Sequence, residues 1–351
     1  MASRDRDFFD GIFNRAIEMG ASDVHIATDS PVFIRVDGRL FNLSDERLNE
    51  SDVKSLLDMW LSEEEWNFFN SAHEMDFAKN FGKSRFRVNL YRSHTGMAVA
   101  VRIIPSEIPA LGELGLPEGV AALCEKEHGL VLVTGKTGAG KSTTMAAMIK
   151  EINDNRRAHI ISMEDPIEYV HVSNKCLVSQ REYGSDFTSF PDALRAALRE
   201  DPDVIVVGEM RDAETVAAAL NAAETGHLVI ASLHTKTAAE SVMRVESFFE
   251  AGRQPQIRAQ LAIVLEAVIS QQLLPGKNGG RVLASEFLIA TLAIRNLMRQ
   301  GKAQQIDSAI MTGGAMGMQT MKKSIGELLS AGKIDTETAE RYFYKESNGA
   351  S

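Results

Sequence analysis

The sequence predicts an α/β fold, with a small α+β domain followed by a larger α/β domain and a C-terminal helical region. Three observations lead to this prediction. In residues 130–152, four apolar residues, a glycine-rich stretch and an amphipathic run follow one another, which is the pattern of strand, loop and helix. In residues 159–232, short apolar runs alternate with helical patterns, as expected for a parallel sheet. The first 104 residues instead carry hairpin patterns and no comparable glycine loop.

The composition is that of an ordinary protein of two domains. The 351 residues are 44% hydrophobic and 25% charged. A net charge of −10 argues against a general nucleic-acid-binding surface. Cys124 and Cys176 are the only cysteines, which excludes a disulfide framework or a four-cysteine zinc site and suits a reducing cytoplasm. We find no signal-peptide core and no run near the ~18 apolar residues of a membrane span.

The first domain is expected to combine helices with strands. Apolar residues at helical spacing predict a helix over residues 7–19. Asp37-Gly38 lies between two alternating runs and predicts a two-residue hairpin. Ser51 is the expected cap of a helix that reaches Trp60, and Ser62 with Glu65 predicts a capping box for the next helix. Strands are expected at 24–26, 32–36, 39–43 and 75–78.

A second hairpin, formed by residues 84–92 and 97–104, brings two arginines together. If Arg92 pairs with Met97, then Arg87 lies directly opposite Arg102. Like charges in opposite positions destabilise a ladder. Either nearby carboxylates relieve this pair or it meets an anion, and a phosphate-binding motif later in the chain favours the anion.

The domain boundary is expected near residue 108. Residues 105–117 are rich in proline and glycine with little periodic pattern, so we interpret them as a linker between domains 1–107 and 108–351. A helix over 119–127 is then expected to lead into the strand at 130–133.

The glycine-rich stretch matches the phosphate-binding pattern G-x-x-x-x-G-K-[ST] at every fixed position. Glycines allow backbone N–H groups to turn inward, and the helix that follows adds partial positive charge at its N-terminus. Lys141 is expected to reach the β- and γ-phosphates of a nucleotide, and the Ser142 hydroxyl to hold Mg²⁺. The alternative is a glycine-rich turn that binds nothing. The expected nucleotide-binding residues are Gly135, Lys136, Thr137, Gly138, Ala139, Gly140, Lys141, Ser142 and Thr143.

Acidic residues follow the next two apolar strands, at the strand ends where α/β sheets bind ligands. Glu164 is the first residue beyond the expected strand 159–163 and is a candidate for orienting Mg²⁺ or water. Glu209 follows Gly208 at the end of strand 203–207 and is the candidate for positioning the attacking water. The strand 203–207 has no acidic residue at its carboxyl end, directly before Gly208. We therefore expect Glu209 and Glu164 to share the roles of binding the metal and positioning water. The alternatives are turn-forming, solvated or helix-capping acids, and these compete most strongly at Asp165 and Glu168.

Two histidines bracket a fourth strand over 228–232. His227 and His234 do not have a metal-ligand spacing, and each alone is more often a hydrogen-bonded structural residue. At a strand end beside the phosphate loop, His234 is a candidate sensor of the γ-phosphate, with His227 a weaker one.

The remainder is expected to be mostly helical. The 311–318 stretch is methionine- and glycine-rich, and we interpret it as core gap-filling rather than a changing contact surface. Helices are expected at 213–224, 238–249, 256–272 and 292–299 and in the segment ending at residue 344, with one added strand at 281–289.

Four segments together resemble one family of proteins. They are similar to the phosphate loop, Asp box, Walker B motif and His box of the secretion and type IV pilus ATPases. Residues 293–298 (AIRNLM) and 318–321 (MQTM) resemble the PilT group of pilus retraction ATPases, with methionine at 298 in place of the usual isoleucine. Residues 21–25 and 35–38 match as well. The four segments are 135–143, 164–168, 208–212 and 225–235.

The resemblance implies a PAS-like N-terminal domain, a RecA-like ATPase domain and a homohexameric ring that hydrolyses MgATP. The arginine fingers of this family come from the N-terminal domain and reach a nucleotide at a subunit boundary. Arg87 and Arg102 fit that role, whereas alternation puts Arg92 on the other face. Extension-type relatives carry a cysteine-rich zinc subdomain that two cysteines cannot build, which favours retraction.

The implied partners follow from the resemblance alone. The ring is expected to pull on an inner-membrane pilus platform protein and drive pilin disassembly, from a cytoplasmic position peripheral to the inner membrane and without insertion into it. Nucleic acid is not an expected partner. The alternatives are an accessory retraction ATPase, a related secretion ATPase, a RecA-like nucleic-acid translocase and a non-catalytic nucleotide-gated scaffold.

Overall fold

The computed structural model describes residues 4–36, 38–82, 84–104 and 107–347. The chain divides into two compact units, Met1–Glu107 and Ile108–Ser351. Asp37 of the expected hairpin turn and Pro105 at the start of the expected linker lie outside the described residues.

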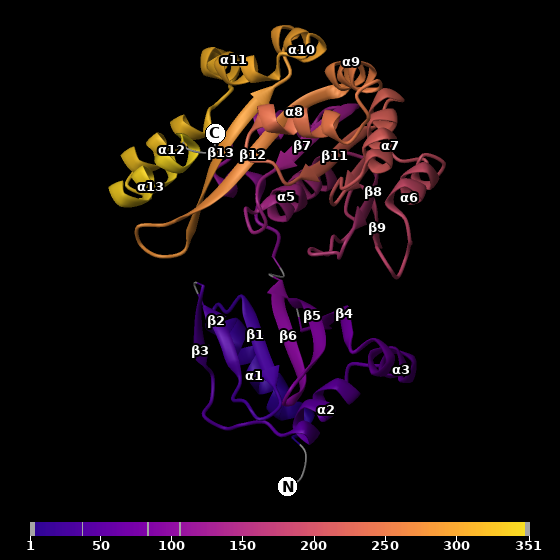
Figure 1. Ribbon diagram of the computed structural model, residues 1–351, viewed down its shortest axis with the longest axis vertical. Coiled ribbons are helices and arrows are strands. Elements are labelled where there is room, and N and C mark those ends of the chain that lie inside the picture. Colours follow the sequence, from indigo (N-terminus) through magenta and orange to yellow (C-terminus); the bar gives the residue numbers. More distant parts are fainter. Residues whose placement is uncertain (1–3, 37, 83, 105–106, 348–351) are drawn as a thin grey trace. The chain divides into compact units, whose positions relative to one another are not determined.

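The first unit is a six-stranded antiparallel sheet with helices on one face (Figure 1). The strand order is β3-β2-β1-β6-β5-β4. Its elements are α1 (Arg6–Glu18), β1 (Asp23–Ala27), β2 (Phe33–Val36), β3 (Arg39–Asn42), α2 (Glu50–Asp58), α3 (Glu63–Ala72), β4 (Glu74–Phe81), β5 (Ser84–Ser93) and β6 (Gly96–Ile104).

Apolar residues of the helices and of one sheet face form the core of this unit. Phe13 of α1 packs against Phe86 of β5, and their ring centroids are 5.0 Å apart. Phe69 of α3 and Leu56 of α2 are fully buried in the same cluster. The Ser62–Glu65 capping box begins α3 as expected. The expected cap at Ser51 is wrong: the side chain of Asn49 accepts the N–H of Asp52, because α2 begins at Glu50, two residues earlier than a cap at Ser51 implies.

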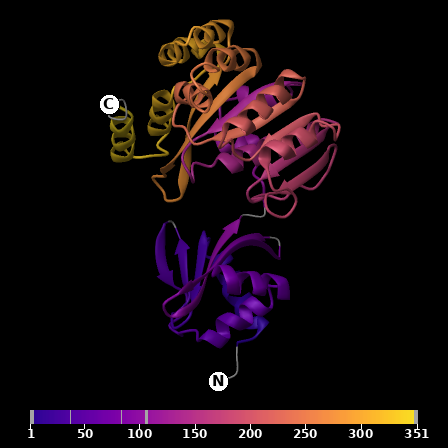
Figure 2. The same cartoon turned by 45° about the vertical axis from the view of Figure 1, so that its right-hand side comes forward.

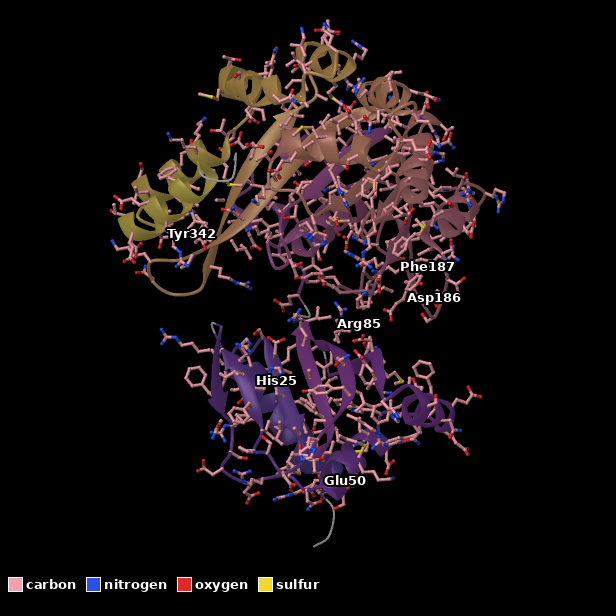
Figure 3. All side chains as sticks on the ribbon, in the orientation of Figure 1. His25, Glu50, Arg85, Asp186, Phe187 and Tyr342 are labelled. Carbon is pink, nitrogen blue, oxygen red and sulfur yellow. The ribbon has the colours of Figure 1, made fainter. Side chains whose placement is uncertain are left out.

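The opposite sheet face carries a row of charged residues that crosses four strands. Arg87 lies opposite Arg102, which confirms the expected register, and Asp23 lies next to Arg102 and opposite Arg35. Asp23 Oδ1 is 3.0 Å from Arg102 Nε, and Asp23 Oδ2 is 3.9 Å from Arg35 Nε. A carboxylate therefore offsets part of the arginine repulsion. His25, labelled in Figure 3, lies two residues further along β1.

The second unit is built on a seven-stranded sheet with the order β13-β12-β7-β11-β10-β8-β9. Strands β12, β7, β11, β10, β8 and β9 are parallel, and β13 is antiparallel to β12. Its elements are η1 (Leu111–Leu114), α4 (Gly119–Cys124), β7 (Gly129–Thr134), α5 (Lys141–Asn155), β8 (His159–Glu164), β9 (Leu177–Glu182), α6 (Phe190–Ala197), β10 (Val204–Val207), α7 (Ala213–Glu224), β11 (Leu228–Leu233), α8 (Ala238–Ser247), α9 (Gln254–Val264), β12 (Leu265–Pro275), β13 (Arg281–Ile289), α10 (Leu292–Arg299), η2 (Ala303–Gln305), α11 (Ile306–Thr312), η3 (Gly313–Met316), α12 (Met321–Ser330) and α13 (Thr336–Ser347).

Both faces of this sheet are buried, so the sequences of its central strands are continuous apolar runs. On β7, Leu130 and Leu132 face a core that includes α6 to α11, whereas Val131 and Val133 face one that includes α4 and α5. Side chains along a strand alternate between faces, which explains why four consecutive apolar residues are all buried. The α/β prediction is confirmed.

The largest error of the sequence analysis is the helix expected at 256–272. Helix α9 ends at Val264, and residues 265–275 form β12, paired with β7 on one side and β13 on the other. An apolar run that is buried on both faces cannot be distinguished from a helix by its periodicity. Strand β9 and helix α6 were not anticipated.

The C-terminal helices α12 and α13 pack against the β12–β13 hairpin, where Figures 1 and 2 draw them in yellow beside the orange strands. Ile325 of α12 and Leu274 of β12 are fully buried in this contact. In the 311–318 stretch, Met318 is buried, as expected for core filling, but Met311 and Met316 are exposed.

Candidate active site

The phosphate loop, residues 135–140, connects the end of β7 to the first residue of α5. Gly135 has φ +147°, and a Cβ there would lie 2.6 Å from the carbonyl oxygen of Gln271 and 2.8 Å from Ala139 Cβ. Gly140 has φ +89° and immediately precedes the helix. Only glycine fits both positions without strain. The loop therefore places backbone groups at a helix N-terminus, which is an anion-binding arrangement.

Lys141 folds back across this loop. Its Nζ donates to the carbonyl oxygens of Gly135 at 2.8 Å and Lys136 at 3.3 Å, and it lies 3.5 Å from His234 Nδ1. Burial lowers the pKa of the Lys141 ammonium, while the Glu209 and Glu168 carboxylates act in the opposite direction. A phosphate at the loop would supply the negative charge that favours the ammonium form.

The order of the strands sets the order of the site residues. Strands β7, β11, β10 and β8 are neighbours in that sequence, and all are parallel. Their carboxyl ends therefore present the phosphate loop, His234, Glu209 and Glu164 along one edge of the sheet. Chain order alone puts Glu164 nearest the loop, whereas in space His234 is nearest.

The Glu209 carboxylate contacts the imidazole of His234 and the guanidinium group of Arg211. His234 Nε2 is 3.0 Å from Glu209 Oε1, and Arg211 Nε is 3.0 Å from Glu209 Oε2. Arg211 in turn lies 3.0 Å from Asp165 Oδ2 through its Nη1. His234 thus bridges Lys141 and Glu209 directly, which agrees with the expectation that it lies beside the phosphate loop.

Gly208 allows the ends of β10 and β8 to approach closely. Its N–H donates to the carbonyl oxygen of Met163 at 2.8 Å, and its own carbonyl oxygen accepts the Ser232 hydroxyl at 2.5 Å. A Cβ at Gly208 would lie 3.1 Å from the Met163 oxygen and 3.2 Å from Glu164 Cα. The segment that carries Glu209 is therefore fixed between two neighbouring strands.

Glu164 is the last residue of β8 rather than the first residue beyond it. Its Oε1 accepts the Ser162 hydroxyl at 2.7 Å and the Gln180 amide at 3.0 Å. Burial raises the pKa of the Glu164 carboxyl, and the hydrogen bonds from Ser162 and Gln180 oppose that rise. A nearby divalent cation would favour the ionised form.

Ser142 and Thr143 lie in the first turn of α5. The Thr143 hydroxyl is 2.9 Å from the Tyr169 hydroxyl, and burial raises the pKa of Tyr169, which keeps the phenol protonated. In the part of the chain that the structure describes, no three His, Cys, Asp or Glu residues gather as a metal site. The oxygen donors Ser142, Glu164 and Glu209 suit a hard ion such as Mg²⁺ that keeps phosphate and water ligands.

Arg211, Gln180 and Tyr169 also contact this group of residues, but the sequence predicted no role for them. Arg211 lies in the 208–212 segment that resembles a Walker B motif, and the direction of its side chain could not be predicted from that segment. Gln180 lies on β9, whose short run Leu-Val-Ser-Gln-Arg-Glu alternates too weakly to indicate a strand.

The structure does not bring His227 to this edge. His227 precedes β11, and its carbonyl oxygen accepts the N–H of Gly129 at the start of β7, at the opposite end of the sheet. Its Nδ1 lies 3.0 Å from the carbonyl oxygen of Ala222. Six strand residues separate the two histidines by about 20 Å. His227 therefore lies outside the site around the phosphate loop of its own chain. Arg87 and Arg102 belong to the other unit.

Residues 5–278 match the family described as "Type II/IV secretion system protein". The chain belongs to this family. Several named members of the family align with nearly the whole chain. The chain is 46% identical over 323 residues to the type IV pilus retraction ATPase PilT of Pseudomonas aeruginosa, covering 92% of this chain and 94% of that protein.

Two further relatives extend this comparison. A twitching motility protein of Neisseria gonorrhoeae is 45% identical, covering 93% of this chain and 87% of the relative. The type IV pilus ATPase PilU of P. aeruginosa is 37% identical, covering 94% and 87%. Within this secretion family, the chain is thus more similar to PilT than to PilU.

Solved structures of family members have the same fold. A crystal structure of the retraction motor PilT with bound ADP has a TM-score of 0.86 at 46% identity, covering 94% of this chain and 95% of that one. The ATPase DotB of Legionella pneumophila has a TM-score of 0.86 at 28% identity, covering 98% and 97%. No helix among the described residues is long and apolar enough to cross a membrane.

Lys141→Ala tests the phosphate loop of this secretion-family protein. Removing the ammonium should lower ATP turnover by about 10² or more, the scale expected when a charge-stabilising donor is lost. Steady-state phosphate release measures this. Lys150→Ala, on the same helix and ion-paired with Asp154 four residues further along, is the control and should keep parent activity. Parent-like turnover by the Lys141 variant would show that the loop assignment is wrong.

Glu209→Gln tests the water-positioning carboxylate. The amide keeps the shape of the side chain but polarises water poorly, so turnover should fall by about 10²–10⁴ while ATP binding persists. Turnover and nucleotide affinity are measured on the same preparation, with Glu214→Gln on the exposed first turn of α7 as the control. Unchanged turnover in the Glu209 variant would transfer the role to Glu164.

Proposed function

We propose that this protein is the subunit of a homohexameric motor that hydrolyses MgATP and powers type IV pilus retraction. Its near full-length similarity to PilT, at 46% identity, carries this proposal. The line of Lys141, His234, Glu209 and Glu164 at one sheet edge supplies the chemistry that such a motor needs.

Each residue of this line has a defined role in the proposed reaction. Lys141 would offset charge on the β- and γ-phosphates, and the Ser142 hydroxyl would hold Mg²⁺, which would supply further positive charge at the phosphates. Glu209 orients the attacking water in line with the γ-phosphate. His234, between Lys141 and Glu209, responds to the presence of that phosphate. Glu164 assists through a water or the metal.

Arg87 and Arg102 complete the site from a neighbouring subunit in this proposal. They lie opposite each other on a unit that has no phosphate loop of its own. Their positive charges stabilise the negative charge that develops in the transition state. Hydrolysis would then depend on the subunit boundary. Each cycle would shift the N-terminal domain against a neighbouring ATPase domain through the 105–117 linker.

The proposed partner is an inner-membrane platform protein of the pilus machinery, which the ring approaches from the cytoplasm. Pulling on it would drive pilin disassembly. Retraction is supported by the higher identity to PilT, which is described as a retraction ATPase, than to PilU.

Deleting the gene tests the cellular role. Cells that cannot retract pili should carry excess surface pili and lose twitching, and a plasmid copy should restore both. Pilus counts by electron microscopy and twitching zones on agar measure these outcomes. Cells without pili would indicate an extension motor, and cells with normal pili and motility would refute the proposal.

Mixed rings test the arginines. Arg87→Ala and Arg102→Ala should each lower turnover by about 10³–10⁵, as for arginine fingers elsewhere, with little loss of ATP affinity. Arg87→Ala mixed with Glu209→Gln should then partly recover activity, because some boundaries join an intact arginine to an intact glutamate.

Mixing Lys141→Ala with Glu209→Gln is the control for the mixed rings. Both of these defects lie in one unit, so no site becomes whole. If exchange of subunits is verified and the first mixture stays inactive, the arginines do not act in trans.

A further inference from the structure

We propose that Arg211 and Asp165 form a positioning pair for the reaction, in which Arg211 fixes the Glu209 carboxylate and Asp165 acts through Arg211. This inference rests on the proposed ATP hydrolysis. The two acids stand at the ends of neighbouring strands, Asp165 after β8 and Glu209 after β10. Arg211 is two residues beyond Glu209.

The guanidinium group of Arg211 uses two different edges for the two acids. Its Nε lies 3.0 Å from Glu209 Oε2, and its Nη1 lies 3.0 Å from Asp165 Oδ2. Because the guanidinium group is planar and rigid, fixing Nη1 on Asp165 also fixes the direction of Nε. The position of Glu209 Oε2 is thus tied to the end of β8.

This arrangement gives the two oxygens of Glu209 different roles. Oε2 is the anchored oxygen, bound to Arg211. Oε1 is the oxygen on the side of the phosphate loop, since it contacts His234, whose other ring nitrogen lies 3.5 Å from Lys141. The geometry points to Oε1 as the oxygen that orients water.

Glu209 needs this support for two reasons. Its backbone follows Gly208, so the side chain begins at a strand end and is not enclosed on all sides; it is 21% exposed. The carboxylate must also stay close to a triphosphate of the same charge sign. The fixed positive charge of Arg211 offsets that repulsion and keeps Oε1 in place.

A purely structural role for the pair is the main alternative. The Arg211 side chain is 58% exposed, and exposed ion pairs add little to stability. Arg195 is a matched case in the same unit: its side chain is 54% exposed and lies near two acids, Asp192 and Glu214. A second alternative is that Arg211 binds phosphate directly.

The test measures kcat, the KM for ATP, ADP affinity and the melting temperature of the full-length protein. The variants are Arg211→Gln, Arg211→Lys, Asp165→Asn and the double variant Arg211→Gln/Asp165→Asn, with Arg195→Gln as the control. Arg211→Gln should lower kcat by about 10², the cost of a small misplacement of a catalytic group, with KM and melting temperature close to those of the parent. Arg211→Lys keeps the charge without the planar fork and should recover part of this loss.

Asp165 distinguishes positioning from direct contact. Asp165→Asn should lower kcat less than Arg211→Gln does, and the double variant should match Arg211→Gln within about twofold, because Asp165 acts only through the arginine. Arg195→Gln should keep parent kcat.

Each remaining outcome overturns the proposal. Additive losses in the double variant would mean that the two residues act separately. A parallel loss of ADP affinity in Arg211→Gln would indicate a phosphate ligand. Parent-like kcat in Arg211→Gln would remove any role, and a lowered melting temperature with unchanged kcat in Arg211→Lys and Asp165→Asn would leave only a structural one. The proposed hydrolysis fails separately, if the parent protein itself does not turn over ATP.

Discussion

The hydrogen-bond register of four parallel strands is the constraint on which the active site depends. Val207 of β10 pairs with Met163 of β8, and Leu233 of β11 pairs with Thr134 of β7. Val207 also pairs with Ala231 of β11, so β7 and β11 end together, two residues beyond the end of β10. The residues that follow these parallel strands therefore lie along the same edge of the sheet. A shift of one residue in any pair would turn the adjacent side chains to the other face. Close packing of these strands against helices on both faces opposes such a shift, because each side chain fills a place in one of two different cores.

Two glycines convert this register into a usable site. Gly135 lies against the backbone of Gln271 on β12, and Gly208 lies against Met163 and Glu164 at the end of β8. In both places the neighbour is backbone, which cannot move aside for a Cβ atom. The first contact presses the phosphate loop onto the sheet, and the second brings the Glu209 segment next to Glu164. The backbone segments that carry the phosphate loop and Glu209 are therefore fixed by the sheet itself.

The sequence predicted those parts of the protein in which local pattern and tertiary environment agree. The phosphate loop, helix α7, strand β13 and the Arg87–Arg102 register depend on fixed spacing or alternation and were anticipated closely. Strand β12 was not, because its apolar run owes its state to pairing with β7 and β13 rather than to its own periodicity. The roles of Arg211 and Gln180 depend on which strands are neighbours, and His227 depends on which end of β11 it occupies. None of these features can be deduced from the spacing of residues along the chain.

In the arginine row of the first unit, one carboxylate reduces the repulsion between like charges and still leaves the row with a net positive charge. Across β5, β6, β1 and β2, the described residues of this row are three arginines (Arg87, Arg102 and Arg35) and one aspartate, Asp23. Asp23 meets Arg102 at Nε, the inner edge of the guanidinium group, which leaves its outer nitrogens available. Within the described residues, no ion pair involves Arg87. Asp23 thus reduces the repulsion between opposed arginines without neutralising them, and this is the charge balance that a surface needs if it is to fold alone and bind phosphate later.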